Sequence, residues 1–155
     1  MRELGIEYGD MVAHNLLWLG CFESRLDGID RMSIVPMSQE ARGLDAGPRL
    51  YEKLKGRGDM RTAKIVNRIA KEELNHVAVG VYWFRQMCGE RENIFDDDTL
   101  GRRYNDSVRR LAPDILRGPF AHKARELCGL HSEWYDGTLK ERLITILAME
   151  EANVS

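Results

Sequence analysis

Cysteine is scarce in this sequence and forms no pair suited to metal binding or redox chemistry. Three cysteines occur among 155 residues, at positions 21, 88 and 128, and no C-x-x-C pair is present. An odd number of widely separated cysteines excludes a disulfide scaffold or a cysteine zinc site, and it is typical of free thiols in a reducing compartment. We therefore expect a cytoplasmic protein, or a protein of an organelle matrix.

Long apolar runs and strand-like alternation are also lacking. Apolar runs are only a few residues long, as in Val77–Val81, whereas a membrane-spanning helix needs about 20. The first seven residues hold acids and no apolar segment, which excludes a secretory signal. A net charge of −2 argues against a dedicated nucleic-acid binder. With no strand-like pattern, the sequence predicts a soluble all-α protein.

Two long helices are predicted from residues spaced three and four apart. The first runs from about Met11 to Arg42, with Pro36 as a kink and Gly43 as its stop. A short helix over Pro48–Lys55 leads to the second long helix, Asp59 to Cys88. The first helix carries the stripe Leu19, Phe22, Leu26, Ile29, Ser33 and Pro36, and the second carries Val66, Ile69, Glu73, His76, Gly80, Trp83 and Met87.

The rest of the chain predicts shorter helices, at Thr99–Leu111, His122–Cys128 and Ser132–Glu151. Residues 1–155 are therefore interpreted as one domain. It comprises an N-terminal loop over residues 1–10, a long-helix pair over residues 11–88, and C-terminal helices over residues 89–155.

Three ionisable residues fall on the two stripes. The next position in this spacing after Pro36 is Glu40. Glu73 and His76 lie one turn apart on one face of the second predicted helix. A buried carboxylate without a partner is costly, and a bound cation would remove that cost. A glutamate on one helix with Glu-x-x-His on another is the ligand unit of dinuclear carboxylate sites in helix bundles. Oxygen and nitrogen ligands without a thiolate favour iron or manganese.

The same spacing has a plainer interpretation. Glu73 and His76 also fit an exposed pair one turn apart, or a core histidine satisfied by a neighbouring acid. Glu40 by itself fits a surface or capping residue. Spacing alone leaves both interpretations open.

Longer motifs resemble a known family. They are R-M-S-I-V-P-M-S-Q-E-A-R-G-L-D at Arg31–Asp45, K-E-E-L-N-H-V-A-V-G at Lys71–Gly80 and R-G-P-F at Arg117–Phe120. Their order and spacing resemble the ferritin-like family of unknown function of the DUF455 type. The resemblance runs from about Gly5 to Gly129, and it implies that Glu40, Glu73 and His76 are metal ligands.

The resemblance also implies that part of the bundle is missing. Members of that family carry an earlier helix pair with its own Glu and E-x-x-H, and this chain holds no second E-x-x-H. We therefore expect a ferritin-like half-bundle, two long helices with shorter C-terminal helices, that supplies three of about six ligands. A homo-oligomer, or a partner that supplies the missing helix pair, would complete it. The expected interface includes Leu26, Ile29, Ile69 and Trp83.

Two functions follow from these expectations. The first is a dinuclear iron or manganese protein that acts as an oxidoreductase with oxygen or peroxide. The alternative is a non-catalytic scaffold or binding module that keeps the ferritin-like fold with a lost or incomplete metal site.

Overall fold

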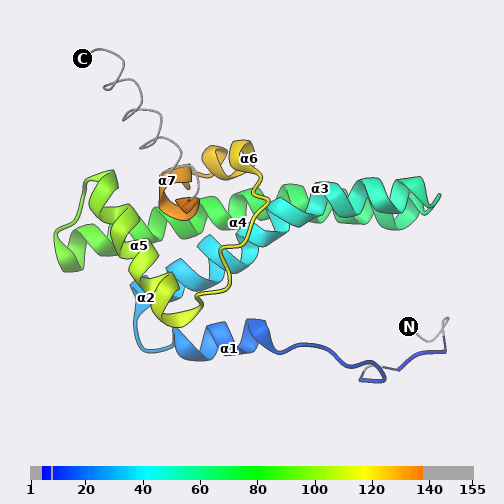
Figure 1. Cartoon of the computed structure of the whole chain (residues 1–155), viewed down its shortest axis with the longest axis horizontal. Helices are drawn as coiled ribbons and strands as arrows, with labels where there is room; N and C mark the ends of the chain where they lie inside the picture. Colours follow the sequence, from blue (N-terminus) through cyan, green and yellow to red (C-terminus); the bar gives the residue numbers. More distant parts are fainter. Residues whose placement is uncertain (1–4, 8, 138–155) are drawn as a thin grey trace, which may run out of the picture.

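The chain is all-helical, as the sequence predicts. A computed structural model describes residues 5–7 and 9–137, and no strand occurs among them (Figure 1). The helices are α1 (Leu16–Glu23), α2 (Gly28–Ile34), the π-helical turn η2 (Val35–Glu40), α3 (Ala41–Gly56), α4 (Met60–Glu92), α5 (Asp97–Leu111), α6 (His122–Leu127) and α7 (Ser132–Tyr135). No helix within the described part of the chain has the length and apolar character needed to cross a membrane.

The second predicted long helix is confirmed as α4, which continues four residues beyond Cys88 to Glu92. The side chain of Asp59 caps its first turn by accepting a hydrogen bond from the backbone N–H of Thr62, at 3.0 Å. At the other end, Asn93 adopts the left-handed conformation that commonly terminates helices. Helices α3 and α4 lie side by side and antiparallel (Figure 1).

The first predicted long helix, Met11 to Arg42, is wrong in its boundaries. Helix α1 begins at Leu16 and ends at Glu23, and α2 begins only at Gly28. The break has a local cause, because the carboxylate of Asp27 accepts hydrogen bonds from the backbone N–H groups of Ile29 and Asp30, at 2.8 and 3.0 Å. A carboxylate in this position starts a new helix by satisfying N–H groups that have no helical partner.

The predicted stop at Gly43 and the separate helix over Pro48–Lys55 are also wrong. The backbone continues from α2 through η2 into α3 and ends at Gly56, passing both Gly43 and Pro48. The irregularity expected at Pro36 is present as η2, because proline lacks the N–H that a regular α-helix would use. Glu40 is the last residue of this π-helical turn.

The core lies where α2, η2, α4, α5 and α7 meet. Ile29 and Phe84 are fully buried there, and the Phe84 ring packs against Tyr104 and Trp134. The first predicted stripe is therefore only half correct, because Leu26 is 87% exposed. Ile29 cannot belong to the expected interface, since the chain's own core already covers it.

The predicted C-terminal helices are confirmed as α5 and α6, within two residues at each end. The helix predicted over Ser132–Glu151 is wrong in its extent, because α7 ends at Tyr135 and Asp136 leaves the helical conformation. Residues 138–151 of that prediction lie outside the described residues.

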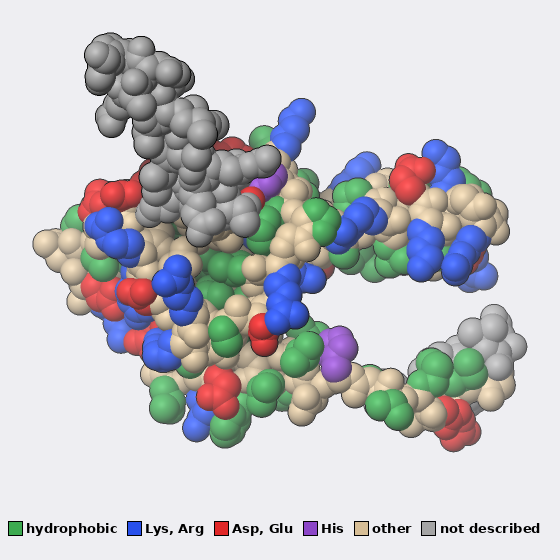
Figure 2. All heavy atoms as spheres, in the orientation of Figure 1, with side chains coloured by type: hydrophobic (Ala, Val, Ile, Leu, Met, Phe, Trp, Pro, Cys, Tyr) green, Lys and Arg blue, Asp and Glu red, His purple; other side chains and the backbone are tan. Residues whose placement is uncertain are grey.

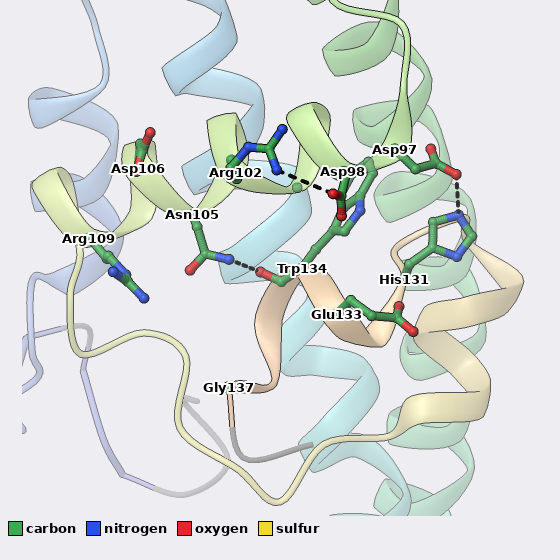
Figure 3. A pocket seen from close by; sticks show the side chains of 11 residues that line it. Asp97, Asp98, Arg102, Asn105, Asp106, Arg109, His131, Glu133, Trp134 and Gly137 are labelled. Carbon is green, nitrogen blue, oxygen red and sulfur yellow. Dashed lines mark hydrogen bonds and ion pairs between the residues drawn. The ribbon is translucent and has the colours of Figure 1, made fainter. Parts of the chain in front are cut away.

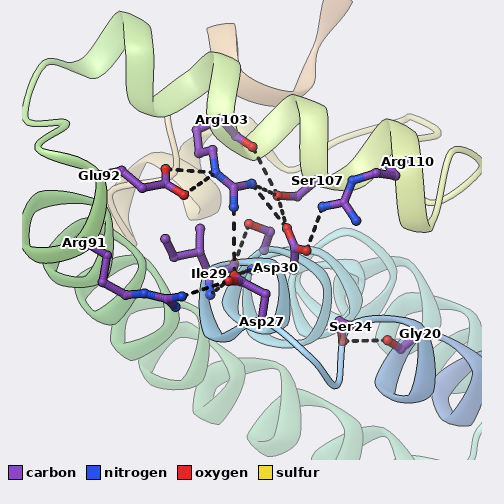
Figure 4. A network of polar contacts seen from close by, with 11 residues as sticks. Gly20, Ser24, Asp27, Ile29, Asp30, Arg91, Glu92, Arg103, Ser107 and Arg110 are labelled. Carbon is purple, nitrogen blue, oxygen red and sulfur yellow. Dashed lines mark hydrogen bonds and ion pairs between the residues drawn. The ribbon is translucent and has the colours of Figure 1, made fainter.

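A network of hydrogen bonds and ion pairs connects α2 to α4 and α5 (Figure 4). The buried carboxylate of Asp30 accepts hydrogen bonds from Ser107, Arg103 and Arg110, at 2.8, 3.2 and 2.6 Å. Burial by itself raises the pKa of Asp30, but these hydrogen bonds outweigh burial and the pKa lies below its usual value. The network holds α2, and with it the following π-helical turn, in one position.

Candidate metal centre

Glu40, Glu73 and His76 converge at one point of the helix hairpin. One ligand atom from each side chain lies within 4.8 Å of the others. Nδ1 of His76 is 3.1 Å from a carboxylate oxygen of Glu73, one turn earlier on α4. Glu40 reaches the same point from the end of η2, where the chain enters α3. The structure thus brings together all three residues that the sequence predicts as ligands.

Glycines allow the two helices to approach closely at this point. A methyl group on Gly43 of α3 would lie 3.0 Å from Cγ of Glu73, and one on Gly47 would lie 2.6 Å from Cβ of Ala70. On the α4 side, a methyl group on Gly80 would lie 2.5 Å from Cβ of Pro36. The contacts at Gly47 and Gly80 are too close for a Cβ atom, and one at Gly43 would require Glu73 to shift by a few tenths of an ångström. The glycines therefore allow η2 and α3 to lie close against α4 beside Glu40 and Glu73.

The electrostatics of the three side chains favour a cation. Burial, together with the neighbouring carboxylate of Glu73, raises the pKa of Glu40, and His76 lowers it by a smaller amount. Two carboxylates and an imidazole at this separation form an oxygen and nitrogen donor set of the kind that binds iron or manganese. A bound divalent cation would compensate the repulsion between the two carboxylates.

The three side chains are not equally buried. The side chain of Glu73 is 20% exposed, whereas that of His76 is 56% exposed. The expectation of an interior site is therefore wrong for His76 in the single chain. A hollow of about 380 Å³ opens beside the carboxylates, between α1, η2 and α4. Its lining residues are Leu17, Cys21, Val35, Gln39, Glu40, Gly43 and Glu73.

The other histidines have different partners. His122 lies 3.0 Å from the hydroxyl of Tyr135, and His131 lies 2.8 Å from a carboxylate oxygen of Glu126. Within residues 5–7 and 9–137, Glu40, Glu73 and His76 form the one group of three or more His, Cys, Asp or Glu side chains arranged to hold a metal.

A second cavity, which sequence reasoning missed, lies between α5 and α7 (Figure 3). Its volume is about 610 Å³, and Trp134 packs at its wall against Gly101 of α5. Among its charged groups, Asp98 forms an ion pair with Arg102, and Nε2 of His131 lies 3.8 Å from a carboxylate oxygen of Asp97. The cavity depends on tertiary packing of Trp134, for which the sequence holds no short-range signal.

Comparison with known proteins identifies a family for this chain but no activity. Residues 1–136 match the model of a family described as "Protein of unknown function (DUF455)". An uncharacterized protein of Haemophilus influenzae is 38% identical over 91 residues, which are 59% of this chain and 32% of that protein. The chain thus aligns with about a third of the length of this curated relative. No solved structure matches.

Proposed function

The chain belongs to the DUF455 family of proteins of unknown function, and we propose that it binds iron or manganese through Glu40, Glu73 and His76. The observation that carries the proposal is the convergence of the three ligand atoms within 4.8 Å. The pKa of Glu40 is raised by burial and, to a smaller extent, by the neighbouring Glu73 carboxylate, and a bound cation would offset both effects.

We further propose that the chain is a ferritin-like half-bundle with a dinuclear site. A glutamate from one helix and Glu-x-x-His from the antiparallel neighbour are half of such a ligand set. Two carboxylates and one imidazole are too few to hold two metals, so an opposing helix pair would supply the remainder. The exposed imidazole of His76 and the open hollow beside Glu40 and Glu73 support this arrangement, because both leave room for further ligands.

The bound metals would supply redox chemistry with oxygen or peroxide, which makes the protein an oxidoreductase. In this role Glu73 positions His76 through the 3.1 Å contact between them. Gly43 leaves room for the Glu73 side chain, because a methyl group at Gly43 would lie 3.0 Å from Cγ of Glu73. Leu17 and Val35 contribute apolar lining to the hollow beside the carboxylates.

The test is oxygen consumption by protein loaded anaerobically with ferrous ion. We expect faster consumption than with the same concentration of free ferrous ion, and expect Glu73→Gln to remove the difference. The matched control is Glu90→Gln, an exposed carboxylate on the same helix, about 25 Å along its axis from Glu73. Equal rates for the wild type, Glu73→Gln and free iron would contradict the oxidoreductase proposal.

A second candidate is a non-catalytic scaffold that keeps the fold with an incomplete metal site. The exposure of His76 favours it, because a water-exposed imidazole with two carboxylates holds a metal only weakly. Metal retention separates the two candidates, since a scaffold would keep no iron or manganese after desalting.

We also propose a reducing location, the cytoplasm or an organelle matrix. It is supported by the absence of disulfides between the three cysteines, of which Cys88 and Cys128 are buried. Fractionation of cells that produce the tagged protein would test this location.

A further inference from the structure

The tip of the α3–α4 hairpin carries a concentration of positive charge. Residues 46–71, which form this tip, hold eight of the 23 Lys and Arg residues of the chain but only two of its 25 Asp and Glu residues. The net charge of the tip is therefore +6, whereas that of the whole chain is −2. Net charge averages over the entire surface, so the value of −2 does not exclude a local site for a polyanion.

The basic side chains of the hairpin tip are available to a partner. All eight are exposed. Figure 1 shows the tip projecting beyond α6, and Figure 2 shows Lys and Arg side chains gathered along this projection. Lys55 lies 3.6 Å from Glu52 and Arg68 lies 2.8 Å from Glu72, and both of these ion pairs are exposed and therefore weak. The other six form no ion pair within the described part of the chain.

Four of these basic residues form a row along one face of α4. They follow one another in steps of three, four and three residues, which places them on one side of the helix. They are Arg61, Lys64, Arg68 and Lys71. This basic row is about 15 Å long, with about 5 Å between successive members. A further step of four residues continues it to the exposed amide of Asn75.

The basic row faces away from the candidate metal centre. An α-helix turns by about 100° per residue, so Lys64 lies on the opposite side of α4 from Glu73, nine residues later. Helix α3 lies on the Glu73 side, where Gly43 approaches that residue closely. Helices that pack over Glu73 to complete the metal site would therefore leave the basic row uncovered.

We propose that the basic row binds the sugar–phosphate backbone of a nucleic acid. A nucleic-acid strand is a linear polyanion with one phosphate about every 3.4 Å along the duplex axis, so a row of about 15 Å spans about four phosphates. Arg and Lys pair with phosphate oxygens, and the amide of Asn75 donates hydrogen bonds to phosphate or sugar. None of these contacts reads a base, so the binding does not depend on base sequence.

The arrangement of side chains favours a nucleic acid over an anionic membrane. A helix that lies on a membrane turns apolar side chains toward the lipid and keeps its basic residues on the polar face. Here the basic residues form the centre of the exposed face. The apolar side chains of Ile65 and Ile69 lie to one side of the row, toward His76. A lipid surface that met the row would therefore meet charge without apolar contact.

Fluorescence anisotropy of a labelled DNA duplex of about 20 base pairs tests the proposal with the full chain. We expect affinity to fall about 100-fold between about 50 and 200 mM salt, because contact with about four phosphates releases their counterions. The row variant changes Arg61, Lys64, Arg68 and Lys71 to Gln. We expect it to bind at least about tenfold more weakly at about 50 mM salt, with a smaller dependence of affinity on salt.

The matched control removes four exposed cations outside the hairpin tip, with Arg25, Arg102, Arg109 and Lys123 changed to Gln. Its net charge equals that of the row variant, but we expect its affinity to stay within about threefold of the wild type. A second variant exchanges Arg and Lys within the row, which keeps every charge, and it should also bind like the wild type.

Several results would overturn the proposal. Equal losses of affinity in the row variant and the matched control would show that only overall charge matters. A loss in the exchange variant as large as in the row variant would show that charge does not carry the contact. No binding of the wild type to the duplex would also contradict the proposal, as would tighter binding to phosphatidylserine vesicles or to polyglutamate than to the duplex.

Discussion

Gly43 of α3 faces Glu73 of α4 so closely that a methyl group on Gly43 would lie 3.0 Å from Cγ of Glu73. The side chain of Glu73 continues from this contact to His76, whose Nδ1 is 3.1 Å from its carboxylate. The position of one ligand therefore depends on the absence of a side chain on the opposite helix.

Gly43→Ala should accordingly weaken metal binding without unfolding the protein. The added methyl group displaces Glu73 by a few tenths of an ångström, and we expect manganese affinity to fall by about tenfold, as for other residues that orient a ligand. Gly56→Ala is the control, since nothing lies within 4 Å of its added methyl group. Manganese titration of both variants measures the difference, and an unchanged affinity in Gly43→Ala would show that the contact does not orient Glu73.

The ion pair between Asp45 and Arg125 should stabilise the fold strongly. Both side chains are buried, with Nε and Nη2 of Arg125 at 2.9 and 2.6 Å from the Asp45 carboxylate. Asp45→Asn leaves a buried guanidinium without its counter-charge, so we expect a loss of about 3–5 kcal/mol in the free energy of unfolding by urea. Glu52→Gln, which breaks the exposed pair with Lys55, should cause no measurable change. Similar losses in both variants would contradict this assignment.

Asp30 should contribute to unfolding in acid. Its folded-state pKa is lowered, because hydrogen bonds from Arg110, Ser107 and Arg103 outweigh the effect of burial. A lowered carboxyl pKa gives stability that is present above the usual value of 3.8 and is lost as pH falls through the folded-state pKa. Asp30→Asn should therefore be less stable than the wild type at pH 7 and lose less stability below pH 4. Urea unfolding of both proteins between pH 3 and pH 7 measures both effects. The same pH dependence of the free energy of unfolding in Asp30→Asn and the wild type would contradict the prediction.

Helix α4 could be predicted from sequence because its signals are local. Asp59 at its start, the spacing of three and four along it, and the turn that separates Glu73 from His76 all depend on neighbours in the chain. Its end at Glu92 was missed, because Gly89 resembled a stop while the helix continued past it.

The boundaries of α1, α2 and η2 could not be predicted in the same way. The predicted stripe assumed one continuous α-helix. In the structure α1 ends at Glu23, a new helix begins after Asp27, and a π-helical turn follows at Val35–Glu40. Asp27 followed by Gly28 was the signal for the break, since aspartate often caps a helix. Pro36 did signal an irregularity at this point, but a proline alone does not specify that the irregularity is a π-helical turn.

The convergence of the three candidate ligands was predicted more successfully than their burial. Periodicity placed Glu40, Glu73 and His76 on inward faces, and the three side chains do converge. The exposure of His76 could not be foreseen, because periodicity shows that a face is apolar and does not show which chain covers it.

Metal content per chain, measured together with solution mass, tests the central claim most directly. Purified protein is reconstituted with ferrous or manganous ion, desalted, and analysed by elemental analysis and light scattering. We predict about one metal per chain in an assembly of two or more chains, because each pair of chains would hold a dinuclear site. Glu73→Ala should retain none, while Glu90→Gln should match the wild type. Wild-type protein that keeps no metal after desalting, or Glu73→Ala that keeps as much as the wild type, would contradict the assignment of Glu40, Glu73 and His76 as a metal centre.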